Sequence, residues 1–165
     1  MKLKINHIAS RLIIAIIAFA MLASCSGVKK LQQMEVKSYK IESIVPHGFR
    51  SIDGTIAITV NNPGSRISMT ECSGTVYDGD KALVDFTIDD FTINGKCEGK
   101  YPITVNAELG RGISLFSLKS LISSNFDNYT VDLHGKAKIK GLGTKKVDLK
   151  NVPARALARY FGIRR

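Results

Sequence analysis

Tryptophan is absent from this chain of 165 residues, cysteine occurs three times, and aromatic residues make up only 7% of it. Three cysteines are too few for a disulfide-rich scaffold. The longest apolar run, Leu12–Ala23, is too short to cross a bilayer core of roughly 30 Å as a helix, so a multi-span membrane protein is excluded. Apolar residues make up 44% of the chain, which is an ordinary globular composition and argues against extensive disorder.

Residues that build metal centres and catalytic sites are also scarce. After residue 24 there is no C-x-x-C or H-x-x-x-H spacing among Cys72, Cys97, His47 and His134. There is no G-x-S-x-G motif, and no serine stands at an informative spacing from a histidine and an acid. We therefore expect no metal, no cofactor and no enzymatic activity.

Acidic residues are nearly missing from the C-terminal end. Residues 136–165 hold ten lysines and arginines against the single acid Asp148, whereas residues 25–135 are close to neutral. The net charge of +10 therefore belongs mainly to the end of the chain. Residues 1–24 have the pattern of an export signal, and the residues that follow are nearly neutral up to residue 135. An exported protein with this charge distribution is a poor match to a nucleic-acid-binding protein, so we expect no nucleic-acid partner.

The N-terminus has the pattern of an export signal over residues 1–24. A basic start up to Arg11 is followed by the apolar run Leu12–Ala23. The run ends in Leu22-Ala23-Ser24-Cys25, which resembles a bacterial lipobox: an aliphatic residue, two small residues, and the cysteine that receives the lipid. The resemblance implies cleavage after Ser24 and lipidation of Cys25, with residues 25–35 as a tether.

Several acyl chains on one cysteine would anchor the protein durably, because each buried methylene contributes about 0.8 kcal/mol. No acid follows Cys25 directly in Ser26–Lys30. In such lipoproteins an aspartate at that place favours retention in the inner membrane. We therefore expect a lipid-anchored protein of the bacterial envelope, in the outer membrane and facing the periplasm.

An alternation of apolar and polar residues predominates from Ile41 to Leu149. It is clearest in 52–60, 101–109 and 129–140, and it predicts strands with one buried face. Turn residues recur between these segments at Asn62-Pro63-Gly64, Asp78-Gly79-Asp80, Asn94-Gly95 and Gly141-Leu142-Gly143. Only 113–122 has helical spacing. We expect an all-β antiparallel sandwich of about seven strands with one short helix, spanning residues 36–150.

The stretch from Ile56 to Ile88 is similar to the LEA type 2 family, the WHy domain of water-stress proteins. Its strand Ile56–Asn61 ends in Asn62-Pro63, and a second strand leads through Tyr77 into a hairpin at Gly79. Gly64 departs from the usual Asn-Pro-Asn pattern. The resemblance implies an immunoglobulin- or fibronectin-III-like sandwich. Pro63 lacks the amide proton that would continue a strand ladder, so we interpret Asn62, Pro63 and Gly79 as structural residues.

Two features leave alternatives open. Cys72 and Cys97 either form a disulfide or stay apart, because the sequence does not supply the Cα separation below about 7 Å that a bridge needs. The basic tail, residues 151–165, either packs on its own domain, contacts anionic lipid or docks a partner. Its candidate contact residues are Arg155, Arg159, Arg164 and Arg165.

These patterns favour a non-enzymatic envelope lipoprotein with a binding or stress-protective role. Its partners would be the membrane, through the lipid, and another envelope protein. Two alternatives remain: an interaction subunit of an envelope assembly that docks through its basic C-terminal segment, and a carrier of a small ligand or lipid.

Overall fold

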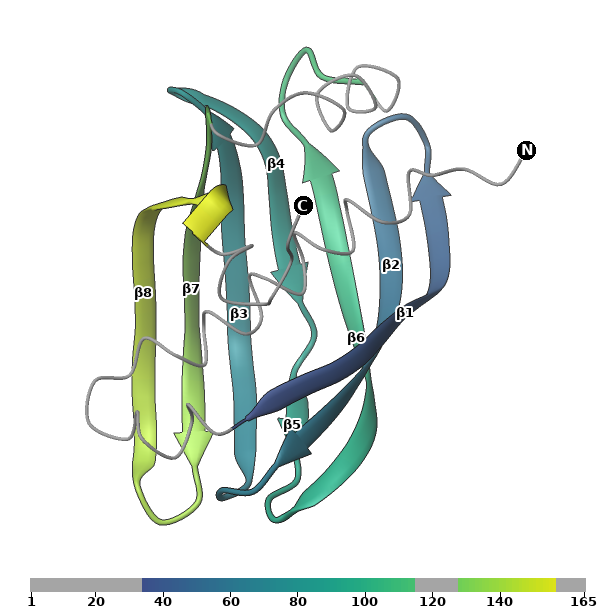
Figure 1. The fold of residues 1–165 in the computed structure, drawn as a ribbon. Helices are drawn as coiled ribbons and strands as arrows, with labels where there is room; N and C mark the ends of the chain where they lie inside the picture. Colours follow the sequence, from purple (N-terminus) through teal and green to yellow (C-terminus); the bar gives the residue numbers. More distant parts are fainter. Residues whose placement is uncertain (1–33, 115–127, 157–165) are drawn as a thin grey trace.

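The computed structural model describes residues 34–114 and 128–156, and these residues form an all-β, sandwich-like fold (Figure 1). Strands account for most of them, and a single helical turn follows at residues 154–156. The strands are β1 (Glu35–His47), β2 (Ser51–Asn62), β3 (Ile67–Asp78), β4 (Lys81–Ile88), β5 (Phe91–Ile93), β6 (Cys97–Leu109), β7 (Tyr129–Ile139) and β8 (Gly143–Pro153).

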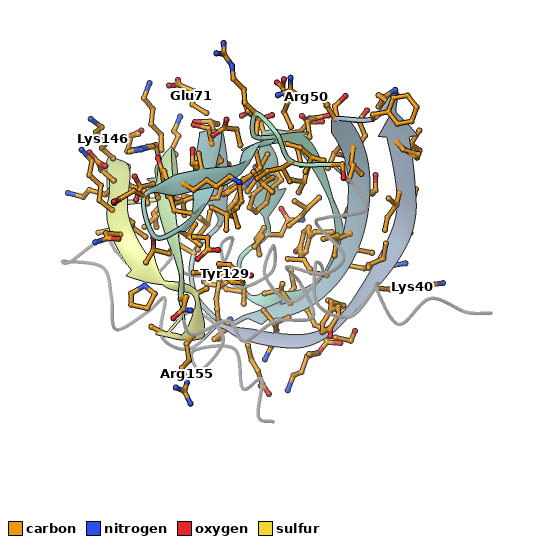
Figure 2. All side chains as sticks on the ribbon, turned by 90° about the horizontal axis from the view of Figure 1, so that it is seen from above. Lys40, Arg50, Glu71, Tyr129, Lys146 and Arg155 are labelled. Carbon is orange, nitrogen blue, oxygen red and sulfur yellow. The ribbon has the colours of Figure 1, made fainter. Side chains whose placement is uncertain are left out.

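All eight strands belong to one antiparallel sheet. Its order is β1-β2-β6-β4-β3-β7-β8, and the short β5 pairs with β3 beyond the end of β4. The sheet curves so strongly that β1 and β2 come round to face the side of β7 and β8 (Figure 2). The interior enclosed by this curve takes the place of the space between the two layers of a sandwich.

Strand alternation decides which residues fill that interior. Ile56 on β2 pairs with Ile103 on β6, and Gly74 on β3 pairs with both Phe86 and Leu133. The inward side chains form one cluster of buried residues, with Ile93 and Ile103 fully covered. Burying an aliphatic or aromatic side chain contributes about 1.5–3 kcal/mol, so this cluster is the main source of stability.

The turns lie where the sequence predicts them. Gly79 joins β3 to β4 with a φ of 56°, a left-handed conformation that glycine adopts without steric cost. Asn94-Gly95 joins β5 to β6, and residues 140–142 join β7 to β8. These turn predictions are confirmed.

The predicted all-β antiparallel fold is confirmed, with eight strands rather than seven. Two boundaries differ from the expectation. β1 begins at Glu35, inside the predicted tether, and β8 continues to Pro153, three residues into the predicted tail. Both strands extend because their partners do: Glu35 pairs with Asn61, and Pro153 pairs with Thr130. Most of the predicted helix at 113–122 lies outside the described residues.

Asn62 is the only polar residue among those described that is fully buried, with 1% of its surface exposed. Its Nδ2 donates to the carbonyl oxygens of Ser65, at 2.9 Å, and Asn94, at 3.0 Å. Its Oδ1 accepts a hydrogen bond from the Gly64 amide at 2.9 Å. One amide therefore joins the β2–β3 loop to the β5–β6 loop, and the interpretation of Asn62 as a structural residue agrees with this geometry.

Replacing Asn62 with alanine should lower the free energy of unfolding by about 2–3 kcal/mol, because two carbonyls and one amide lose a buried partner. Urea unfolding measures the change. Asn61→Ala, one position earlier and only half-buried, is the matched control and should stay within about 0.5 kcal/mol of the parent. Equal losses in the two variants would show that the hydrogen bonds of Asn62 do not hold the loops together.

Candidate binding site

The outer face of the sheet carries polar side chains in continuous rows across the strands. One row crosses six strands, because each member is the register partner of the next: Asp53, Asn106, Thr87, Ser73, His134 and Asp148. A second row runs beside it through Ser51, Glu108, Asp85, Thr75 and Asp132. Strand alternation produces both rows, since every second residue points away from the core.

A groove of about 420 Å³ lies over the middle of these rows. Three carboxylates line it, Asp53, Asp85 and Glu108, together with hydroxyl groups of serine and threonine and the amide of Asn106. His134 is the one basic side chain in its lining, which contains no lysine or arginine. The groove is therefore acidic and rich in hydrogen-bond acceptors.

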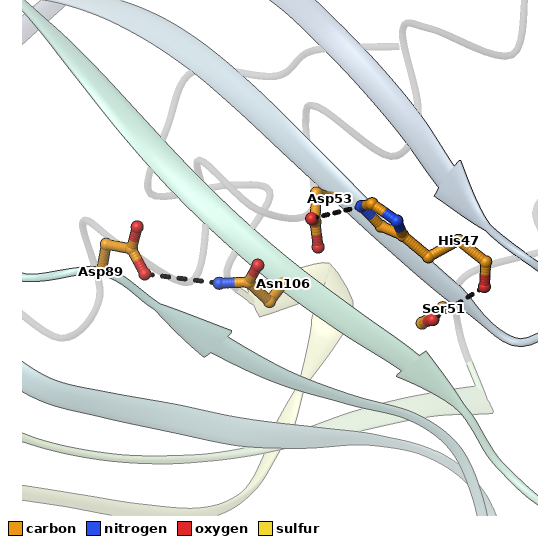
Figure 3. A network of polar contacts seen from close by, with 5 residues as sticks. All are labelled: His47, Ser51, Asp53, Asp89 and Asn106. Carbon is orange, nitrogen blue, oxygen red and sulfur yellow. Dashed lines mark hydrogen bonds and ion pairs between the residues drawn. The ribbon is translucent and has the colours of Figure 1, made fainter.

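Hydrogen bonds hold several of these side chains in place (Figure 3). His47 Nε2 and Asp53 Oδ2 lie 2.6 Å apart, and the Ser51 hydroxyl donates to the His47 carbonyl at 2.9 Å. Asn106 donates to Asp89 at 3.3 Å. On the next strands Thr75 donates to Asp85 at 2.6 Å. No partner among the described residues neutralises Glu108, which leaves its carboxylate available to a ligand.

The first row places Ser73, His134 and Asp148 on three neighbouring strands. His134 Nδ1 lies 3.0 Å from Asp148 Oδ1, as in a catalytic triad. Among the described residues, however, no hydrogen bond joins Ser73 to His134, and the pairing of β3 with β7 is irregular between Thr70 and Ser73.

Sequence reasoning missed this row because its members lie far apart in the chain. The turn at Gly141–Gly143 does contain a signal for one pair: a hairpin closed there aligns His134 with Asp148. Ser73 comes next to His134 only through the pairing of β3 with β7. No local pattern predicts that contact.

The structure leaves the two cysteines apart. Cys72 is buried on β3 beside Ile88, and Cys97 is exposed at the start of β6 beside Asn62. Ile88 pairs with Val105, eight residues along β6 from Cys97, so the cysteines are on the order of 25 Å apart. The disulfide alternative is therefore wrong for this fold, because a bridge needs less than about 7 Å.

Most residues predicted for signal cleavage, lipidation, or lipid or partner contact lie outside the described part of the chain: Leu22, Ala23, Ser24, Cys25, Arg159, Arg164 and Arg165. Arg155 is exposed in the helical turn that follows β8 (Figure 2). Among the described residues, no helix has the length and apolar character needed to span a membrane.

The lysines of β7 lie inside the sheet and not at its edge, because β8 pairs with β7 on the outer side. Lys136 pairs with Lys146 on β8, and its Nζ lies 2.7 Å from Glu71 Oε1. Glu71 occupies an irregularity in β3 with a φ of 54°, and its amide donates to Asp90. The edge itself is covered by charges of β8, at Lys145, Lys146 and Lys150.

Comparisons with known proteins identify no family. No protein-family model matches the chain, and no curated protein sequence matches it. A crystal structure of a protein from Archaeoglobus fulgidus is similar with a TM-score of 0.42 and 11% identity, over 70% of this chain and 91% of that chain. The resemblance to the LEA type 2 family stays a prediction.

The two thiols should differ in reactivity. Burial, with a smaller contribution from Asp90, raises the pKa of Cys72 to about 11, so its reactive thiolate is scarce at pH 8. Native protein should add one maleimide, at Cys97, and unfolded protein should add two, read by mass spectrometry of a Cys25→Ser chain. No addition to either thiol before reduction would show that the cysteines are bridged.

Proposed function

We propose that this protein is a non-enzymatic lipoprotein of the bacterial cell envelope that binds a partner through the acidic groove of its sheet. Lipidation at Cys25 would hold it on the membrane, and a LEA type 2-like domain would present the groove. The observation that carries the binding role is the groove itself, in which three carboxylates line a cavity without lysine or arginine.

The chemistry of the lining favours a cationic or hydroxyl-rich ligand. Asp53, Asp85 and Glu108 attract positive charge and accept hydrogen bonds, while Thr87 and Asn106 add donors between them. A basic protein segment fits these requirements, and so does a polyhydroxylated molecule. An anionic ligand would meet repulsion from all three carboxylates.

The carrier alternative fits the structure less well. A lipid or other small apolar ligand would need space inside the curve of the sheet. The described strands fill that interior with side chains in mutual contact, including Met69, Phe86 and Leu109. The polar groove lies on the opposite face of the sheet.

An exposed apolar hairpin favours a second candidate, an interaction subunit of an envelope assembly. Ile44 and Val45 near the end of β1 are about half exposed, and Phe49 in the β1–β2 turn is 83% exposed. Arg155 follows β8 at the same end of the sheet, since Thr130 pairs with Pro153 and Asp78 with Tyr129. Aromatic and arginine side chains together are typical of interface hot spots.

Lipid anchoring predicts that Cys25→Ser moves the protein from the detergent phase to the aqueous phase in a detergent phase-separation experiment. The wild-type chain should also incorporate a labelled fatty acid, and the variant should not. Ser26→Ala is the matched control and should behave as wild type. Incorporation of the label by Cys25→Ser would contradict the anchor.

Groove binding predicts that a photo-crosslinker at Thr87 captures a partner in native membranes, whereas one at Thr144, outside the groove on β8, does not. Glu108→Gln should weaken the Thr87 adduct severalfold, because one ligand-facing charge is removed. Gel shift and mass spectrometry measure the adduct. Equal adducts at Thr87 and Thr144, or an adduct insensitive to Glu108→Gln, would contradict a specific groove.

A further inference from the structure

Three loops meet at one end of the sheet, and each carries a basic residue. Arg66 lies in the β2–β3 loop, Lys96 in the β5–β6 loop, and Lys140 in the β7–β8 loop. We call these residues, with Leu142, the basic end. Their loops meet at the bottom of the view in Figure 1.

Main-chain hydrogen bonds hold these loops together. The Lys96 amide donates to the Gly64 carbonyl at 3.0 Å, and the Lys140 amide donates to the Arg66 carbonyl at 3.0 Å. A methyl group on Gly95 would collide with the backbone of Gly64 and Arg66, which shows how closely the loops pack. The backbone positions of the three basic residues are therefore fixed relative to one another.

The basic end is exposed, and two acids lie at the same end of the sheet, because Glu35 begins β1 and Glu98 follows Cys97 at the start of β6. Arg66, Lys96 and Lys140 are exposed, and none forms an ion pair with a described residue. The loops that hold them contain no acid. Leu142, beside Lys140, is 49% exposed at the tip of its hairpin. Exposed cations on adjoining loops, together with an exposed leucine, complement an anionic lipid surface.

The tether reaches the domain at this same end. Glu35 opens β1 opposite Asn61, and Asn61 in turn pairs with Glu98 at the start of β6. Nine residue steps separate Cys25 from Met34, a reach of about 30 Å at most. The exposed Phe49 lies a further 40 Å or so away, along the length of β1.

We propose that the basic end is a docking surface for anionic phospholipid headgroups, which sets the domain upright on its membrane. This inference rests on the anchor proposed at Cys25. Arg66, Lys96 and Lys140 contact the phosphates, and Leu142 enters the interface between them. The apolar hairpin then points away from the bilayer, and the groove, on the outer face of the sheet, lies at the side of the domain.

The opposite end also carries exposed basic residues, Arg111 and Arg155 among them, but acids lie close to several of the charges there. Lys81 stands in a turn with Asp78 and Asp80, so acids offset its charge. Arg50 donates to the Leu109 carbonyl at 2.9 Å, which ties it to the domain. The point where the chain enters the domain, opposite Asn61, therefore decides which end we assign to the lipid.

The experiment uses the mature chain from residue 26 with an N-terminal histidine tag, held on vesicles by a nickel-chelating lipid. This tether replaces Cys25, so a failure of natural lipidation leaves the result intact. A fluorophore is placed by Leu142→Cys in a Cys97→Ser background, and quenching by a lipid-bound nitroxide is measured. Vesicles of phosphatidylcholine are compared with vesicles that also contain phosphatidylglycerol.

We expect strong quenching on the anionic vesicles only, weakened by high salt and lost in Arg66→Glu/Lys96→Glu/Lys140→Glu. The matched control, Lys81→Glu/Arg111→Glu/Lys150→Glu, changes the net charge equally and should keep the quenching. If Arg66→Glu/Lys96→Glu/Lys140→Glu is quenched as strongly as the parent on anionic vesicles, the proposal is overturned. Stronger quenching of a label placed by Phe49→Cys would show the inverted orientation and would overturn it as well.

Discussion

An antiparallel ladder that continues across the whole sheet is the constraint on which the rest of the structure depends. Because the pairing runs from β1 to β8 without a gap, one set of alternating side chains fills the interior and the other set faces solvent. The same registers that bury Ile56 beside Ile103 place Asp53 beside Asn106 on the outer face. The core and the acidic groove are thus two consequences of one pairing scheme.

Asn62 adds a second, local constraint at the end where the chain enters the domain. A buried amide with all its partners satisfied fixes the geometry of its surroundings, since any displacement would leave a polar group unpaired. Here the surroundings are the β2–β3 and β5–β6 loops, which carry Arg66 and Lys96. Asn62 belongs to the Asn-Pro turn that is similar to the LEA type 2 pattern, and it therefore also shapes the proposed lipid-facing surface.

The two ends of the sheet have different chemistry, which gives the proposed functions a consistent geometry. The chain enters the domain at one end, which also carries Arg66, Lys96 and Lys140, and the exposed Phe49 lies at the other. Ligand capture through the groove and partner docking through the hairpin both need surfaces that the bilayer does not cover. Electrostatic attraction at the basic end would provide that orientation without any contact to the groove.

Local rules within the sequence determined much of this protein: the alternating strands and the turns at Gly79 and Gly95. Alternation and turn chemistry act over a few residues, so they can be recognised without a fold. The pairing of distant strands decided the rest. Only the tertiary structure placed Ser73 beside His134, separated Cys72 from Cys97, and gathered Arg66, Lys96 and Lys140 at one end, because these relations depend on registers that the loops between strands do not specify.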